Sequence, residues 1–154
     1  MFEKIKSWLQ SESVEFREVH HEVTLTSEQS ARARGEDISV GGKALVLKVG
    51  GTFSIFVLSA ARKLDSNAIK SHFSVKKTRF ASRDELLELT GLEPGSVPPF
   101  GKPLIDLELY VDQSIIDNEK IAFNAGSLTD SLILNTKDYL EVAKPESFKF
   151  SVQG

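Results

Sequence analysis

The segment KALVLKVGGTFSIFVLSA, residues 43–60, constrains the fold more than any other part of the sequence. Two runs of aliphatic and β-branched residues flank Gly50 and Gly51, a pair that allows the primed turn of a two-residue β-hairpin. Because both runs are almost continuously apolar, we expect the two strands to be covered on both faces. Such a hairpin needs further elements packed on each side of its sheet.

Helix and strand signals alternate along the rest of the chain. Helical spacing of apolar residues and capping signals predict helices at 2–11, 27–34, 66–72, 83–90 and 138–143. Alternating or β-branched runs predict strands at 14–19, 78–80, 105–111, 120–123 and 132–134. This interspersed order predicts an α+β fold, in which a mixed, largely antiparallel sheet curls like a barrel around the core and carries helices outside.

Length and composition set the broad class. The 154 residues fit one domain, residues 1–154. The absence of cysteine excludes disulfides, thiolate metal sites and cysteine nucleophiles, and it favours a cytoplasmic location. No apolar run approaches the roughly 20 residues of a membrane span, so no membrane partner is expected. Neither HExxH, nor GxSxG, nor a Walker phosphate loop occurs, and no metal or cofactor is indicated.

Charge is unevenly distributed along the chain. The net charge of −3 argues mildly against a general nucleic-acid binder. Residues 60–83, however, hold seven Lys and Arg against one Asp, a local +6 that leaves −9 for the remainder. Such a basic strip suits a partner that touches one face through phosphates. A solvated, lysine-rich helix and edge strand is the alternative interpretation.

Three features carry candidate chemistry. The stretch GLEPGSVPPFG, residues 91–101, holds three glycines and three prolines, and could be a rigid loop whose main chain forms a binding surface, or only a turn. Lys43 opens a buried strand and could bind phosphate or carboxylate, or simply reach water as a strand-end lysine. The turn NAGSLTD, residues 124–130, is small and polar. Together they would enclose a site for something small and partly anionic.

The histidines form no obvious metal site. His20 and His21 are adjacent on a predicted strand, so their side chains would point to opposite faces and could not chelate one ion. Either one could face a pocket, and a surface histidine is the alternative. We take His20 as a candidate substrate contact.

Three motifs, in this order and spacing, resemble the YbaK superfamily: GGKALVLK, TGLEPGSVPPFG and IAFNAGSLTDSLILNTKDYL. That superfamily includes free-standing aminoacyl-tRNA deacylases and the editing domain inserted in bacterial prolyl-tRNA synthetases. The resemblance covers about residues 14–143 and is strongest to a branch of single-domain deacylases distinct from YbaK itself. It implies trans-editing, the hydrolysis of the ester that joins a wrong amino acid to the terminal adenosine of a tRNA, which is needed because synthetases cannot reject small isosteres by binding alone.

The resemblance also implies residue roles. Lys43 would hold the phosphate or ribose end of the adenosine, and the backbone from Gly95 to Pro99 would line the reacting carbonyl and the water. A ribose hydroxyl of the substrate would help to activate that water, and main-chain groups would stabilise the oxyanion. The candidate catalytic residues are therefore Lys43, Gly95 and Pro99. The candidate substrate contacts are Ser96, Val97, Pro98, Phe100, Gly101, Asn124, Ala125, Gly126, Ser131 and His20. The candidate tRNA contacts are Lys76, Lys77 and Arg79.

Two departures from the family pattern bear on the amino acid removed. Phe123-Asn124 stands where alanine-specific members often carry a histidine-proline pair, and Ser131 lies near the place of an aspartate. A polar residue such as Asn124 would suit serine, threonine or alanine. The expected partners are the acceptor end of an aminoacyl-tRNA and, transiently, a synthetase. The alternatives are a non-catalytic tRNA- or synthetase-binding module with the same pocket, and an esterase that acts on small aminoacyl esters without tRNA.

Overall fold

The predicted hairpin is the centre of the computed structural model, which describes all of residues 1–154. Strands β2 (Gly42–Val49) and β3 (Thr52–Ser59) pair antiparallel along their full length, and Gly50 takes the positive φ of +67° that the turn requires. Residues 54–59 of β3 are all buried. Val46, Ile55 and Val57 face one hydrophobic cluster, whereas Leu47, Phe56 and Leu58 face a second, so both faces are covered as expected.

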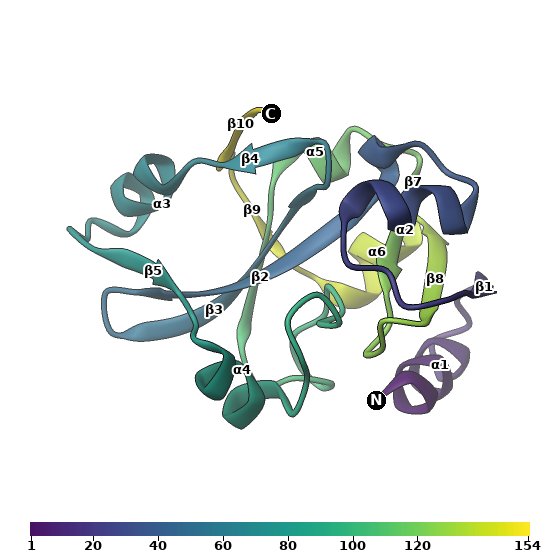
Figure 1. Ribbon diagram of the computed structural model, residues 1–154. Helices are drawn as coiled ribbons and strands as arrows, with labels where there is room; N and C mark the ends of the chain where they lie inside the picture. The colour runs from purple at the N-terminus through teal and green to yellow at the C-terminus, as the bar shows by residue number, and fades with distance from the viewer.

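The strands form three sheets (Figure 1). The five-stranded sheet has the order β5-β2-β3-β6-β9 and contains, besides the hairpin, β5 (Thr78–Phe80), β6 (Glu108–Val111) and β9 (Glu146–Ser147). The three-stranded sheet, all antiparallel, contains β1 (Phe16–His20), β8 (Asp130–Asn135) and β7 (Lys120–Asn124). The pair β4 (Arg62–Leu64) and β10 (Ser151–Gln153) forms the third.

The α+β class and the mixed, largely antiparallel pairing are confirmed, but the barrel-like closure is not. The β3–β6 and β6–β9 pairs are parallel and the others within the sheets are antiparallel. The five-stranded and three-stranded sheets are joined only by an isolated parallel bridge between Gly41 and Ala122. Hydrogen bonding therefore breaks at this seam instead of continuing around the core.

The helices begin and end close to the predicted positions. They are α1 (Phe2–Ser11), α2 (Ser27–Arg34), α3 (Ser66–Phe73), α4 (Arg83–Thr90) and α6 (Thr136–Ala143), with a short α5 (Gln113–Ile116) and a 3₁₀ turn η1 (Ile38–Val40). Ser82 and Glu85 form a reciprocal capping box at α4, and Gly35 and Gly91 end their helices in the left-handed conformation. No helix has the length and apolar character to cross a membrane.

The predicted strand 105–111 is partly wrong, because only residues 108–111 pair with β3. The segment before it folds as a tight turn, in which the Gly101 carbonyl accepts hydrogen bonds from the amides of Leu104 and Ile105. The side chains of Leu104 and Ile105 are buried in the main cluster. The apolar residues that this turn buries therefore produce a sequence pattern that resembles the alternation of a strand.

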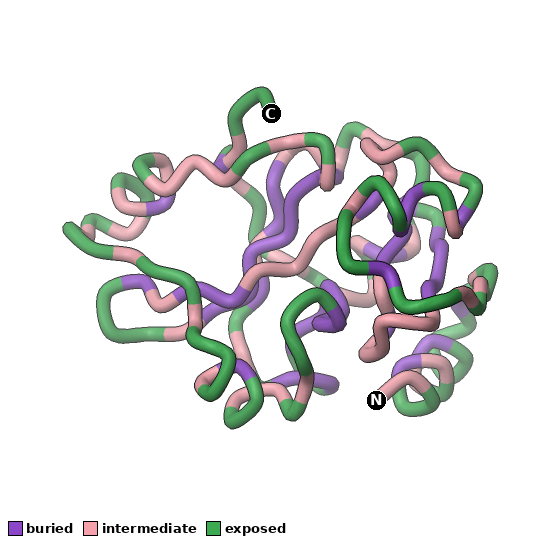
Figure 2. Tube along the Cα trace, viewed as in Figure 1, coloured by how far each residue is buried: buried purple, intermediate pink, exposed green.

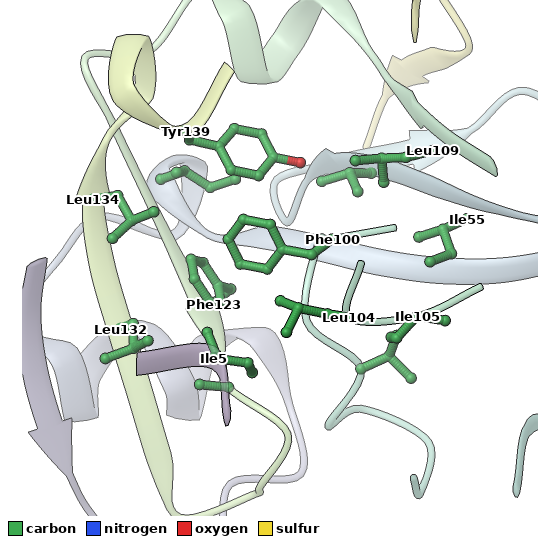
Figure 3. Packing of buried hydrophobic residues seen from close by; sticks show 14 of the residues in the cluster. Ile5, Ile55, Phe100, Leu104, Ile105, Leu109, Phe123, Leu132, Leu134 and Tyr139 are labelled. Carbon is green, nitrogen blue, oxygen red and sulfur yellow. The ribbon is translucent and has the colours of Figure 1, made fainter. Parts of the chain in front are cut away.

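The main core lies where both sheets meet α1 and α6 (Figure 3). Phe100 is 1% exposed and packs edge-to-face against Trp8, Phe123 and Tyr139, each with ring centres 5.4 Å away. Figure 2 shows the buried stretch of the hairpin running through the middle of the molecule. A smaller cluster around Phe56 lies under α3. This packing fixes the segment 96–101 and the start of β2 relative to each other.

Candidate functional site

A cleft of about 160 Å³ lies where β2 begins, between α2 and the segment that starts at Gly95. Its lining residues are Thr24, Leu25, Thr26, Ser27, Ser30, Arg34, Gly41, Gly42, Lys43, Ala44, Leu45, Ala60, Gly95, Val97 and Asn124. The lining contains two cations, Arg34 and Lys43, and no carboxylate. Elsewhere too, no three His, Asp or Glu side chains are grouped to hold a metal ion. The cleft is therefore electropositive and suited to a ligand that carries its own negative charge.

Lys43 is held at the mouth of β2. Its Nζ donates a hydrogen bond of 2.7 Å to the carbonyl oxygen of Arg62, which follows the end of β3. The side chain is half-buried, and burial lowers the pKa of its ammonium below the ordinary value. Because an ammonium has three N–H donors, two remain for a ligand in the cleft.

Gly95 and Val97 contribute main-chain groups to the lining of the cleft. Neither of their N–H groups has an acceptor within the protein, whereas the N–H of Ser96 donates to the Glu93 carbonyl. Gly95 has a φ of +85°, a conformation that favours glycine. Of the predicted loop 95–101, these two residues alone line the cleft.

The rest of the loop faces the core, although the backbone from Gly95 to Pro99 was expected to line the site. Residues 96–101 are buried, and the Pro99 carbonyl accepts a 2.7 Å hydrogen bond from the hydroxyl of Tyr139. At Gly101 a Cβ atom would lie 2.6 Å from the Leu107 carbonyl oxygen, so glycine is needed there for packing. Gly101 borders a different hollow, of about 460 Å³, between α1 and α6. Ser96, Pro98, Pro99 and Phe100 therefore support the cleft without lining it.

Asn124 joins the cleft to the loop and to α2. Its Nδ2 donates to the Gly95 carbonyl at 2.8 Å, and its Oδ1 accepts from a terminal guanidinium nitrogen of Arg34 at 3.0 Å and from Ser131 Oγ at 3.2 Å. Arg34 Nε also donates to Ser131 Oγ at 3.0 Å. Ser131 is fully buried behind Asn124 and does not line the cleft.

Arg34 is the functional candidate that sequence reasoning missed. The buried residues of α2 are Ser30, Ala31 and Arg34, which share one face at spacings of three and four. Arg34 is the only charged residue on that face. The spacing was visible in the sequence, but its significance depends on which side of α2 packs against the sheet.

The remaining predicted contacts lie outside the cleft. Ala125 is fully buried, and Gly126, with a φ of +76°, donates its N–H to the Ser96 carbonyl. The exposed ring of His20 binds Asp130 and Glu18, and the hydrogen bond that the ring donates to the Asp130 carboxylate raises the pKa of His20. His21, in contrast, lies with its Nε2 2.9 Å from Ser131 Oγ and so reaches the polar cluster behind the cleft.

Four cations of the basic strip line a groove of about 380 Å³ at the other end of β2. It is lined by Lys48, Gly50, Lys70, Lys76, Lys77, Thr78 and Arg79, with no acid. Glu85 does not line the groove, but both of its carboxylate oxygens accept hydrogen bonds from the Arg79 guanidinium, at 2.7 and 2.9 Å. This pairing lowers the pKa of Glu85 to about 2. At about 3.3 Å per strand residue, Lys48 lies roughly 17 Å along β2 from Lys43.

Comparison with known proteins decides the family. Residues 21–142 match the model of the aminoacyl-tRNA editing domain. The chain belongs to this family. The resemblance inferred from the three motifs is thereby confirmed, and with it the expected enzyme class, the aminoacyl-tRNA deacylases.

Individual relatives agree with this assignment. The chain is 36% identical to the multifunctional Ser/Thr-tRNA deacylase ProXp-y of Escherichia coli (strain K12), in an alignment that covers 96% of this chain and 91% of that protein. It is 33% identical over 101 residues to the proline–tRNA ligase of Shouchella clausii, of which the match covers 18%. A crystal structure described as a candidate trans-editing enzyme for prolyl tRNA synthetase has the same fold, with a TM-score of 0.84 at 21% identity, over 97% of this chain and 96% of that one.

Proposed function

We propose that the chain is a trans-editing hydrolase that removes a small amino acid from mischarged tRNA. The observation that carries this proposal is the acid-free cleft, which Lys43 lines together with Gly95 and Val97, two residues whose N–H groups have no acceptor within the protein. A cation and main-chain donors in a narrow cleft suit an ester next to a phosphate. The name of the E. coli relative, a Ser/Thr-tRNA deacylase, supports the substrate class.

In the proposed mechanism, Lys43 binds the phosphate or ribose of the terminal adenosine and so places the ester carbonyl over Gly95. The neighbouring ribose hydroxyl orients and activates a water molecule, whose oxygen adds to the carbonyl carbon. The N–H groups of Gly95 and Val97 stabilise the oxyanion that develops. The ester C–O bond then breaks, and the ribose oxygen takes up a proton as the free amino acid leaves.

In this proposal, the size and polarity of the cleft determine which amino acid is removed from the tRNA. A volume of about 160 Å³ favours a small side chain, and Asn124 supplies a polar group at the wall. Serine and threonine can satisfy that group through their hydroxyl, whereas alanine cannot. We therefore rank seryl- and threonyl-tRNA above alanyl-tRNA as substrates.

The groove at the far end of β2 is proposed as the tRNA phosphate site, with Lys76, Lys77 and Arg79 as contacts. Its lining is basic and acid-free, and each phosphate contact steepens the logarithmic dependence of affinity on salt by roughly 0.7–0.9. The double variant Lys76→Glu/Lys77→Glu should weaken tRNA binding and flatten that dependence. Lys4→Glu/Lys144→Glu makes the same change in net charge on exposed residues outside the groove. Equal binding and equal salt slopes for both pairs would contradict this assignment.

Turnover separates the proposed enzyme from its alternatives. The wild-type chain would be incubated with correctly and wrongly charged tRNAs and with a seryl ester of adenosine. Rapid loss of seryl- or threonyl-tRNA, with slow loss of the small ester, is the expected result. A non-catalytic binding module would protect the aminoacyl ester from spontaneous hydrolysis, and a general esterase would cleave the small ester equally well.

A further inference from the structure

Arg34 is a buried guanidinium without an acid. The residue is 8% exposed, and no carboxylate lies within ion-pair distance of it. Burial lowers the pKa of Arg34 to about 10, so the side chain stays charged at neutral pH. A buried charge is costly unless polar groups compensate it. The two side-chain oxygens that accept from Arg34, on Ser131 and Asn124, are therefore held to it strongly.

The chemistry of the guanidinium fixes the orientation of the Asn124 amide. Arg34 has N–H donors and no acceptor, so Asn124 must turn its oxygen, and not its NH₂ group, toward α2. The Ser131 hydroxyl donates to that same oxygen at 3.2 Å. If the amide flipped, its NH₂ group would face the guanidinium and its oxygen would face the Gly95 carbonyl, leaving both pairs without a hydrogen bond.

This orientation decides which polar atom the cleft presents. Asn124 Nδ2 carries two hydrogens, one of which bonds the Gly95 carbonyl at 2.8 Å. The second hydrogen remains for a ligand in the cleft that Asn124 lines. An N–H donor pairs with an oxygen lone pair, which the hydroxyl of serine or threonine provides and the methyl group of alanine does not.

We propose that Arg34 is a positioning residue that holds Asn124 as a hydrogen-bond donor and thereby sets the preference of the cleft for hydroxyl-bearing aminoacyl groups. This inference rests on the proposed function and adds to it the determinant of specificity. Arg34 acts through Asn124, and its removal should change discrimination between substrates more than the rate on alanyl-tRNA.

The test compares kcat/KM for seryl-tRNA and alanyl-tRNA in the wild type and in Arg34→Met, which keeps an unbranched side chain of similar reach and removes the donors. Losing one correctly directed hydrogen bond should lower the seryl-to-alanyl ratio by about fivefold to tenfold. Arg32→Met is the matched control, because Arg32 is exposed on the same helix and two residues away. Its ratio should equal that of the wild type.

Further variants keep the test decisive if Arg34→Met does not fold. Asn124→Asp is isosteric, gives Arg34 a carboxylate partner and removes the donor, so it should lower the same ratio. Arg34→Lys keeps a donor-only cation and should retain part of the preference. An unchanged ratio in folded Arg34→Met, or in Asn124→Asp, would overturn the inference. A wild type that deacylates neither substrate would instead overturn the proposed function.

Discussion

Removing a single oxygen atom from Tyr139 tests how the loop that ends at the cleft is held. Tyr139 is 0% exposed and lies in the core (Figure 3), and its hydroxyl donates to the Pro99 carbonyl at 2.7 Å. Burial raises the pKa of Tyr139, so the hydroxyl keeps its proton and remains a donor. In Tyr139→Phe the ring packing is retained and the Pro99 carbonyl loses its partner in the core.

The expected cost follows from that unpaired carbonyl. A buried polar group left without a partner destabilises a protein by about 1–3 kcal/mol. For a chain of this length each kcal/mol corresponds to roughly 2–4 °C, so Tm should fall by about 2–12 °C. In urea denaturation followed by circular dichroism, the midpoint should fall while the m-value stays constant.

The other tyrosine supplies the control. Tyr110 stacks on Phe56 with ring centres 5.2 Å apart, and its hydroxyl makes no hydrogen bond within the protein. Tyr110→Phe should therefore change the unfolding free energy by less than about 0.5 kcal/mol. If Tyr139→Phe were equally mild, the hydroxyl would not be what holds Pro99. Deacylation by folded Tyr139→Phe should stay close to wild type, because Pro99 does not line the cleft.

Two further predictions concern residues that sequence reasoning placed in the site. Gly101→Ala puts a Cβ atom 2.6 Å from a backbone oxygen and should destabilise the chain by about 1–3 kcal/mol in chemical denaturation, and a stability equal to wild type would contradict the packing role. His20 should titrate above its ordinary pKa of 6.5 in NMR, and Asp130→Asn should bring it down. Because the pKa of His20 is raised in the folded state, the pairing of His20 with Asp130 stabilises the fold. This contribution is complete below about pH 6.5 and is lost as the pH rises through the folded pKa of His20. An unshifted His20 in the wild type would refute the pairing.

Local signals explain what the sequence predicted of the fold. The hairpin and the helices were found because a Gly-Gly turn, a capping box at Ser82 and helix-ending glycines act within a few residues. Of the four strands with three residues or fewer, β5 was predicted and β4, β9 and β10 were missed, because so few residues carry little pattern and the pairing depends on a distant partner. The sheet seam at Gly41 was hidden for the same reason.

Only the cleft residues that lie within the three motifs could be predicted from the sequence. Lys43, Gly95, Val97 and Asn124 line one cleft as the motifs suggested. Arg34 escaped notice because an arginine in a polar helix is normally exposed, and only tertiary packing buries it.

The sequence predicted that the side chains of His20 and His21 point to opposite faces of the strand, but it did not indicate which of the two approaches the cleft. His20 pairs with Asp130 across β8, where both lie in register at the strand end. His21 lies one residue past β1, and its side chain reaches Ser131. This choice depends on where β1 ends, and that boundary has no clear signal in the sequence.

The most direct test of the central claim is single-turnover deacylation of seryl-tRNA by the wild type, Lys43→Ala and Lys4→Ala, an exposed lysine on α1. With folding verified for each chain, we expect rapid hydrolysis by the wild type and Lys4→Ala, and at least a hundredfold loss, about 2.7 kcal/mol of transition-state stabilisation, in Lys43→Ala. Hydrolysis by Lys43→Ala at the wild-type rate would show that the chemistry does not take place in this cleft.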